Sequence, residues 1–139
     1  MDILIVEDDR DTCEALVNTI KHAGYSVQGF YSSQGTLSIP HHLKPKVLIA
    51  DINLGEDVDG VTLARAAVSL YGRDLGVVFV TGYNFDFKKY KLASNERFLQ
   101  KPISSSTLLR TVNELIHYMA NRETIHNLKT RTGSSREQP

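Results

Sequence analysis

The stretch that decides the fold is Val47-Leu48-Ile49-Ala50-Asp51, four apolar residues followed by a carboxylate. Such a continuous apolar run is typical of a strand that is buried on both faces, as in a parallel sheet. A charge at the carboxyl end of a buried strand costs several kcal/mol in desolvation unless something compensates it. That edge of an open α/β sheet is also where ligands bind. Asp51 is therefore the first candidate functional residue.

Working outward from this strand, the chain alternates strands with helices. Five strands are predicted, and each is followed by a run with helical spacing or by a helix start signal. This alternation predicts right-handed βαβ units and a doubly wound α/β fold with a five-stranded parallel sheet. We adopt the flavodoxin-like (βα)5 strand order 2-1-3-4-5, because the first, third and fourth strands are the most apolar. The predicted strands are residues 3–6, 26–30, 47–51, 76–80 and 97–100, and the predicted helices are 13–23, 33–43, 61–70, 85–93 and one from 104 onward.

The chain is predicted to hold one domain and an extension. Residues 1–120 carry all five strands and are the size of a single domain. The apolar stripe of the last helix fades after Ala120, although Ile125 and Leu128 favour more helix. Residues 121–139 are therefore expected to be a helical extension that ends, from Thr130, in a polar and disordered tail.

Composition excludes several classes of protein. Sixteen basic and sixteen acidic residues cancel, so no net field draws the chain to nucleic acid or membrane. No apolar run approaches the roughly 18 residues of a membrane helix. The single cysteine, Cys13, rules out an internal disulfide, and its place on an apolar helical stripe predicts a core thiol. We expect a cytoplasmic protein with no nucleic-acid and no membrane partner.

Carboxylates follow two strands that the predicted order makes neighbours. Glu7, Asp8 and Asp9 follow the first strand, and Asp51 ends the third. Taken alone, the first acid run is equally typical of residues that cap a helix. Three carboxylates at one crevice would repel each other unless a cation lies among them, and Mg²⁺ suits such oxygen ligands. The sequence therefore predicts Mg²⁺ near Glu7, Asp8 and Asp51.

Two more strand ends supply complementary groups. Thr81 follows the fourth strand with a hydroxyl donor, and Lys101 follows the fifth with an ammonium. A carboxylate nucleophile, a metal, a hydroxyl and an ammonium together suit phosphoryl transfer, which mainly demands positioning and neutralisation of charge. The chain has no Gly-x-x-x-x-Gly-Lys-Ser/Thr loop and no Gly-x-Gly-x-x-Gly turn, so it lacks the backbone apparatus of a nucleotide site.

This set of motifs resembles the receiver domain of two-component response regulators over about residues 1–120. The resemblance is carried by Ile-Leu-Ile-Val-Glu7-Asp8-Asp9, Asp51, Thr81 and Phe98-Leu-Gln-Lys101-Pro102. It implies that Asp51 accepts a phosphoryl group from a histidine kinase or a histidine phosphotransfer protein. It further implies that Asp8, Asp51 and the main-chain carbonyl of Asn53 bind Mg²⁺, that Glu7 acts mostly through water, and that Thr81 and Lys101 bind phosphoryl oxygens.

The resemblance also implies a switch. Phosphorylation would draw Thr81 inward, let Phe98 turn in behind it, and remodel a face made by the helix at 85–93, the strand at 97–100 and the last helix. A downstream protein target would bind that face. Phe79-Val80-Thr81-Gly82-Tyr83 is similar to the loop of mostly single-domain receivers, so Tyr83 could replace Phe98 as the switch aromatic; both readings stay open.

One loop departs from the family pattern. Gly55 stands where the family usually has proline, and the Asp59-Gly60 pair comes one residue later than usual. Glycine frees the backbone there, which puts the metal side of the site in doubt.

The leading hypothesis is a single-domain response regulator, a phosphoprotein switch rather than an enzyme, that is a monomer or a phosphorylation-dependent homodimer. One alternative is a receiver-like interaction module that is never phosphorylated. A less favoured alternative is a small phosphatase with an aspartyl-phosphate intermediate, because Asp51-x-Asn53 superficially matches such nucleophile motifs. Those enzymes need a second acid two residues on, and Asn53 cannot titrate.

Overall fold

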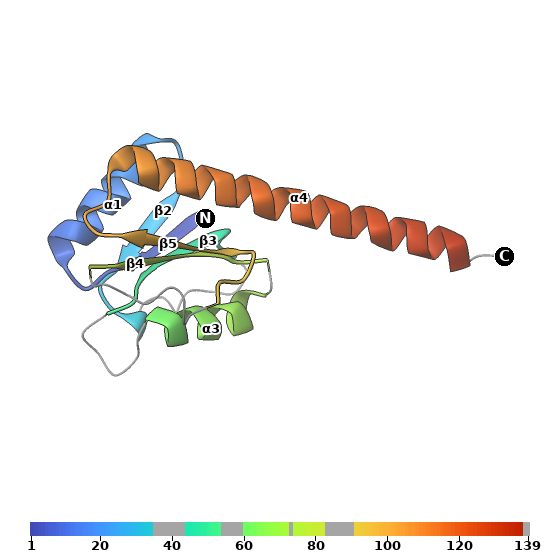
Figure 1. Cartoon of the computed structure of the whole chain (residues 1–139), viewed down its shortest axis with the longest axis horizontal. Helices are drawn as coiled ribbons and strands as arrows, with labels where there is room; N and C mark the ends of the chain where they lie inside the picture. Colours follow the sequence, from blue (N-terminus) through green and yellow to red (C-terminus); the bar gives the residue numbers. More distant parts are fainter. Residues whose placement is uncertain (35–43, 54–59, 73, 83–90, 138–139) are drawn as a thin grey trace.

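A computed structural model describes residues 1–34, 44–53, 60–72, 74–82 and 91–137 (Figure 1). The five strands form one parallel sheet in the order β2-β1-β3-β4-β5, which confirms the predicted topology and leaves the polar β5 at an edge. The strands are β1 (Ile3–Val6), β2 (Val27–Phe30), β3 (Val47–Asp51), β4 (Gly76–Thr81) and β5 (Glu96–Gln100). The helices are α1 (Arg10–His22), α3 (Gly60–Tyr71) and α4 (Ser105–Glu137).

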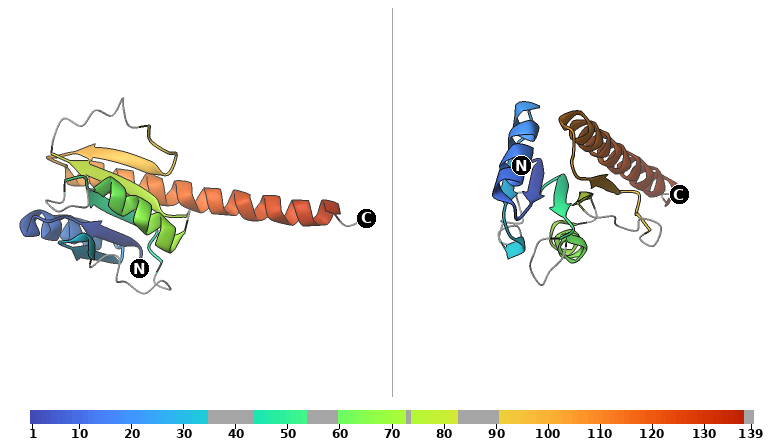
Figure 2. Two further views of the ribbon diagram at one scale, coloured as in Figure 1. Left: turned by 90° about the horizontal axis from the view of Figure 1, so that it is seen from below. Right: turned by 60° about the vertical axis from the view of Figure 1, so that its left-hand side comes forward.

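The three described helices lie on both faces of the sheet. In Figures 1 and 2, α1 and α4 lie on one face and α3 lies on the other. Alternate residues of β1, β3 and β4 face the two layers, so each of these strands is buried on both faces. The α3 layer contains Leu4, Val6, Leu48, Ala50, Val77 and Phe79 of the sheet; the α1/α4 layer contains Ile3, Ile5, Val47, Ile49, Val78 and Val80.

The helix ends follow the signals in the sequence. Gly24 adopts a φ of 98° just after α1, and Gly72 adopts a φ of 95° just after α3. Only glycine takes up this left-handed conformation at little cost, so both residues stop their helices. At the start of α4, the Ser104 hydroxyl accepts a hydrogen bond from the Thr107 backbone N–H at 3.2 Å. Ser104 therefore caps α4.

Two predicted helices fall largely outside the described residues. The helix expected over 33–43 is described only at Ser33 and Gln34. The helix expected over 85–93 is described only at 91–93, which are not helical.

Helix α4 runs past the domain without a break. Leu115 packs against Gly76 of β4, and Met119 is the last residue of α4 that is buried against the sheet. The helix then projects away from the domain and ends at Glu137 (Figures 1 and 2). This differs from the disordered tail expected from Thr130, since no proline interrupts residues 120–137 and each turn needs only its own backbone hydrogen bonds. The division at residue 120 stays a prediction.

Among the described residues, no helix is both long enough and apolar enough to cross a membrane.

Cys13 lies in the α1/α4 layer as a core thiol, as predicted, and is 1% exposed. Burial raises the pKa of its thiol, and the charges of Glu7 and Glu14 add to that effect. Because the thiolate is the reactive form, we expect a thiol reagent to label the native protein at least about 100-fold more slowly than the protein in denaturant. The chain has one cysteine, so absorbance of the released reagent reports this site alone. Equal rates in both conditions would contradict the core assignment.

Candidate functional site

The parallel register brings four strand ends to one edge of the sheet. Val6 of β1 lies opposite Ala50 of β3, so Glu7 and Asp51 come next to each other. On the other side of β3, Asp51 pairs with Val80, and the Ile52 N–H donates to the Val80 carbonyl at 2.9 Å. Thr81 ends β4 beside the end of β5, where the Lys101 N–H donates to the Thr81 carbonyl at 2.8 Å.

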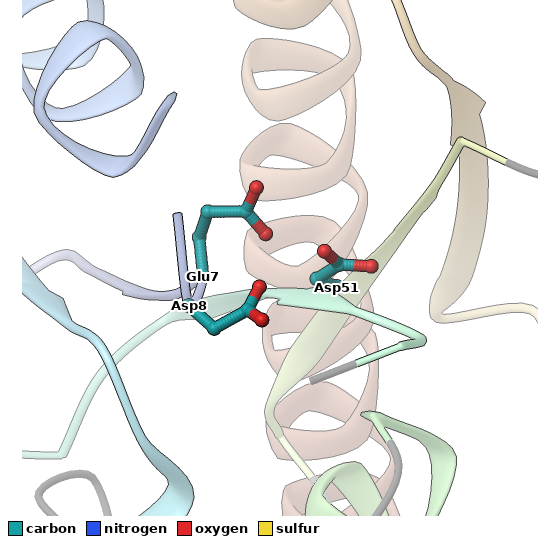
Figure 3. Close-up of side chains that lie close together, drawn as sticks. All are labelled: Glu7, Asp8 and Asp51. Atoms are coloured by element: carbon teal, nitrogen blue, oxygen red, sulfur yellow. The ribbon is translucent and has the colours of Figure 1, made fainter. Parts of the chain in front are cut away.

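Three carboxylates converge at this edge. Glu7, Asp8 and Asp51 each offer one oxygen, and these oxygens lie within 4.8 Å of one another. Figure 3 shows the three side chains directed toward a common space from β3 and from the segment after β1. Glu7 is 2% exposed and Asp51 is 7% exposed, whereas Asp8 is exposed to solvent. The structure thus brings together the carboxylates that the sequence placed at one crevice.

Asp9, the remaining acid of the run that follows β1, has a different position. Asp9 occupies the N-cap position of α1, but its carboxylate accepts a hydrogen bond from the Thr12 hydroxyl and none from a backbone N–H of the helix. The position expected of a cap therefore belongs to Asp9, while Glu7 and Asp8 face Asp51.

Lys101 supplies the cation that compensates the buried carboxylates. Its Nζ donates a hydrogen bond to Oε1 of Glu7 and another to Oδ2 of Asp51, the latter at 3.1 Å. The second oxygen of Asp51, Oδ1, accepts the Asn53 backbone N–H at 3.0 Å. Lys101 precedes a cis peptide bond to Pro102. The link between Lys101 and Glu7 was not anticipated from the sequence, which assigned this lysine only to phosphoryl oxygens.

The site shifts the pKa values of Glu7 and Lys101 upward. The pKa of Glu7 is raised from 4.5 to about 8, first because burial disfavours the charged form and second because of the hydrogen bond and charge of Asp51, while Lys101 opposes the shift. For Lys101, burial disfavours the charged form, but the hydrogen bonds and charges of Glu7 and Asp51 outweigh that cost and raise its pKa. The lysine therefore stays charged, while Glu7 holds a proton at neutral pH.

The residues present fit a hard divalent cation. Oε2 of Glu7 is a buried oxygen with no hydrogen-bond partner among the described residues. An unsatisfied buried oxygen is costly unless a ligand compensates it. All the converging donors are oxygens, which is the ligand type that Mg²⁺ prefers. An ion bound by these carboxylates would thus satisfy the one buried side-chain oxygen that the described part of the chain leaves unpaired.

The predicted switch residues lie just behind the carboxylates. Thr81 is 2% exposed at the end of β4. Phe98 of β5 is half-buried, and its ring lies 5.2 Å, centroid to centroid, from that of Phe79 in the α3 layer. Tyr83 lies outside the described residues, so the choice between Tyr83 and Phe98 as the switch aromatic stays a prediction. The role of the Asn53 main-chain carbonyl as a metal ligand also stays a prediction.

Gly60 is a positioning residue that the sequence did not reveal. It begins α3, and its N–H donates to the Ile52 carbonyl at 3.0 Å. A Cβ at this position would lie 2.2 Å from the carbonyl oxygen of Asp51 and 2.9 Å from Cα of Ile52. Only a residue without a side chain lets α3 begin directly against the backbone of Asp51. The Asp-Gly pair drew attention to this position, but a single sequence gives no sign of the close approach.

We expect Gly60→Ala to destabilise the protein by about 1–3 kcal/mol, because the backbone of Asp51 must shift to admit the methyl group. Urea unfolding measures the change. Gly82→Ala is the matched control at the same edge, since its Cβ would meet only Cδ of Lys101, at 3.9 Å. Equal stability for the two variants would show that the contact with Asp51 is not tight.

Comparison with known proteins assigns the class. Residues 3–113 match the family described as "Response regulator receiver domain". The chain therefore belongs to this family, and it is a receiver domain of a two-component system. This agrees with the sheet order and with the acidic edge of the sheet.

Three similar proteins illustrate the family. The chain is 30% identical over 117 residues to an uncharacterized 14.6 kDa protein of Leptolyngbya boryana, covering 82% of this chain and 88% of that one. It is 28% identical over 112 residues to the C4-dicarboxylate transport transcriptional regulatory protein DctD of Rhizobium meliloti (strain 1021), covering 78% of this chain but only 24% of DctD. Among solved structures, a two component transcriptional regulator AraC from Clostridium phytofermentans ISDg superimposes with a TM-score of 0.73 at 26% identity, covering 89% of this chain and 98% of that one.

Proposed function

We propose that this receiver domain is a phosphorylation switch that accepts a phosphoryl group on Asp51. The observation that carries the proposal is the arrangement of Asp51 beside two other carboxylates and directly bonded to Lys101. A phosphohistidine of a histidine kinase or phosphotransfer protein is the donor. An Asp51 oxygen attacks phosphorus, the phosphorus–nitrogen bond breaks, and the imidazole keeps the electron pair of that bond.

Three residues around Asp51 have separate roles in this transfer. Asn53 holds one Asp51 oxygen through its backbone N–H, which fixes the rotation of the carboxylate. Lys101 is positioned to neutralise charge on the transferred phosphoryl group, because its ammonium already lies against Asp51. Thr81, at the end of the neighbouring strand, is the proposed hydroxyl donor to a second phosphoryl oxygen.

Glu7, Asp8 and Asp51 are the proposed ligands of Mg²⁺, with the Asn53 carbonyl as a further ligand. The ion, when bound, supplies positive charge that offsets the carboxylates and the phosphoryl oxygens. The unpaired Oε2 of Glu7 supports this assignment, and so does the location of all three acids at one edge. Because burial and Asp51 raise the pKa of Glu7 to about 8, its part in metal binding requires the loss of a proton.

The proposed output is a change in protein binding. Phe98 packs on Phe79 beneath the site, and its neighbour Arg97 places its guanidinium 5.7 Å from the centre of the Tyr118 ring on α4. A movement of Phe98 in response to Thr81 would therefore reach the surface that β5 shares with α4. We propose that a downstream protein binds this surface, either to a monomer or to a phosphorylation-dependent homodimer.

The test combines Mg²⁺ with acetyl phosphate or with beryllofluoride. We expect intact-mass analysis to show one added phosphoryl group, and two-dimensional NMR with beryllofluoride to show shifts at Asp51, Thr81 and Phe98. A protein that gains no mass, and whose spectrum does not change with either reagent, would instead be a receiver-like interaction module.

We further propose that the chain does not turn over a separate substrate. Asn53, two residues after Asp51, offers its backbone N–H to Asp51 and has no titratable group to serve as an acid or base. We therefore expect no hydrolysis of p-nitrophenyl phosphate above background. Turnover that disappears in Asp51→Asn would favour a phosphatase instead.

A further inference from the structure

The projecting part of α4 carries its own apolar face. Ile125 is 52% exposed and Leu128 is 56% exposed, and both lie beyond the last residue that packs on the sheet, Met119. A helix turns about 100° per residue, so Ile125 lies about 240° around the axis from Met119. The exposed pair is thus on a different side of the helix from the stripe that covers the sheet, and it is not a continuation of that stripe.

Positive charges flank this apolar pair. Arg122 and Lys129 are exposed, and they lie three residues before and four residues after Ile125, which puts all three on the same side of the helix. Among the described side chains from 120 to 129, these are the only charged ones, and both are cations.

We infer that the face defined by Arg122, Ile125, Leu128 and Lys129 binds an acidic amphipathic helix of a partner protein. An apolar stripe on the partner would cover Ile125 and Leu128, and glutamates or aspartates beside that stripe would face Arg122 and Lys129. This inference is independent of phosphoryl transfer at Asp51, because the extension lies beyond the residues that pack on the domain.

The composition of this face argues against two other binding partners, a second copy of this helix and a lipid bilayer. A second copy of this helix would bring cations against cations beside the apolar stripe, which destabilises helix pairing. A bilayer would attract the cations, but Ile125 and Leu128 offer only two apolar side chains to insert. An acidic helix complements the charge and covers the apolar pair.

The experiment uses the full chain and two synthetic helical peptides. Both carry leucines at i, i+3, i+4 and i+7; one has glutamates and the other has lysines beside that stripe. We expect fluorescence anisotropy to show binding of the glutamate peptide and at least roughly tenfold weaker binding of the lysine peptide. Equal affinity for both peptides, or no affinity for the glutamate peptide, would overturn the inference.

Variants locate the binding face. Ile125→Ser with Leu128→Ser should weaken binding at least about tenfold, whereas Asn127→Ser, about 200° away from Ile125, should change it less than about twofold. Arg122→Glu with Lys129→Glu should reverse the preference, so that the lysine peptide becomes the better ligand. Lys21→Glu with Lys44→Glu makes the same change in net charge elsewhere and should leave the preference intact. Retained binding in the Ile125/Leu128 variant would overturn the inference.

Two further measurements address the other occupants. Sedimentation velocity should show that Ile125→Ser with Leu128→Ser does not alter the oligomeric state. A wild-type dimer that this variant dissociates would identify a second copy as the occupant. Flotation with phosphatidylglycerol vesicles should leave the protein unbound, and flotation that the same variant abolishes would identify a membrane surface. Either of these results would overturn the inference.

Discussion

Asp51→Asn should abolish phosphorylation, with a loss of at least about 100-fold in the rate of mass gain from acetyl phosphate and Mg²⁺. An amide oxygen is a far weaker nucleophile than a carboxylate oxygen, so the chemical step is lost while the shape of the side chain is kept. The amide oxygen can still accept the Asn53 N–H, which makes large structural changes unnecessary. Intact-mass spectrometry with time gives the rate directly.

The matched control is Asp9→Asn. Asp9 comes after β1, whereas Asp51 ends β3, and Asp9→Asn removes the same charge as Asp51→Asn. Asp9 lies at the N-cap position of α1, bonds to the Thr12 hydroxyl and does not belong to the converging carboxylates. We expect Asp9→Asn to gain mass at close to the wild-type rate. Phosphorylation that survives in Asp51→Asn, or that is lost equally in both variants, would contradict the assignment of Asp51 as the acceptor.

Glu7→Gln should stabilise the metal-free protein at high pH. The pKa of Glu7 is about 8 in the folded protein and 4.5 in the unfolded chain. Between these pH values the folded state therefore keeps a proton that the unfolded state releases. Stability contributed by this group is therefore complete below about pH 4.5, falls as the pH rises from there, and reaches its lowest value above about pH 8. A shift of this size corresponds to roughly 4–5 kcal/mol. We expect a gain of at least about 3 kcal/mol at pH 9, because glutamine is neutral at every pH and avoids the cost of ionising a buried carboxyl group.

Urea unfolding without Mg²⁺ at pH 4.5 and at pH 9 measures this difference. The gain should be small at the lower pH, where Glu7 carries its proton in the folded state and is only half ionised in the unfolded state. Glu114→Gln, on the exposed side of α4, removes the same charge and should have little effect at either pH. A Glu7→Gln variant that is no more stable than wild type at pH 9 would contradict the raised pKa.

Addition of Mg²⁺ above pH 8 should make wild type more stable than Glu7→Gln, which reverses their order in the absence of the ion. A ligand that binds only the folded state stabilises it in proportion to the logarithm of its concentration. Wild type should gain this stabilisation above pH 8, where Glu7 is free of its proton, and Glu7→Gln should gain less of it. Equal gains would show that Glu7 has no part in holding the ion.

The sequence predicted the central sheet well, because β1, β3 and β4 are continuous apolar runs that only a doubly covered strand can bury. The same property predicted that Glu7 and Asp51 would be neighbours, since parallel strands end at one edge. It could not predict that Lys101 bonds to Glu7, because the reach of a long side chain depends on where β5 ends in space. Nor could it predict the contact of Gly60 with Asp51, which depends on how closely α3 approaches the β3 backbone.

The extension of α4 was the least predictable element. Periodicity in a sequence reports burial, and past Met119 there is no sheet for α4 to bury against. Ile125 and Leu128 indicated further helix, but the polar composition from Thr130 was equally typical of a disordered tail. No proline interrupts residues 120–137, so the sequence holds no stop signal for the helix there.

Because α4 has no break, its projecting part moves as a rigid body with the part that packs on the sheet. Leu115 and Met119 hold one arm against β4 and the sheet, and at about 1.5 Å per residue the free arm from Met119 to Glu137 is about 27 Å long. A tilt of about 10° at the sheet would carry the far end by about 5 Å. The same tilt would carry Ile125, about 9 Å past Met119, by only about 1.6 Å, so the displacement grows along the extension without any hinge.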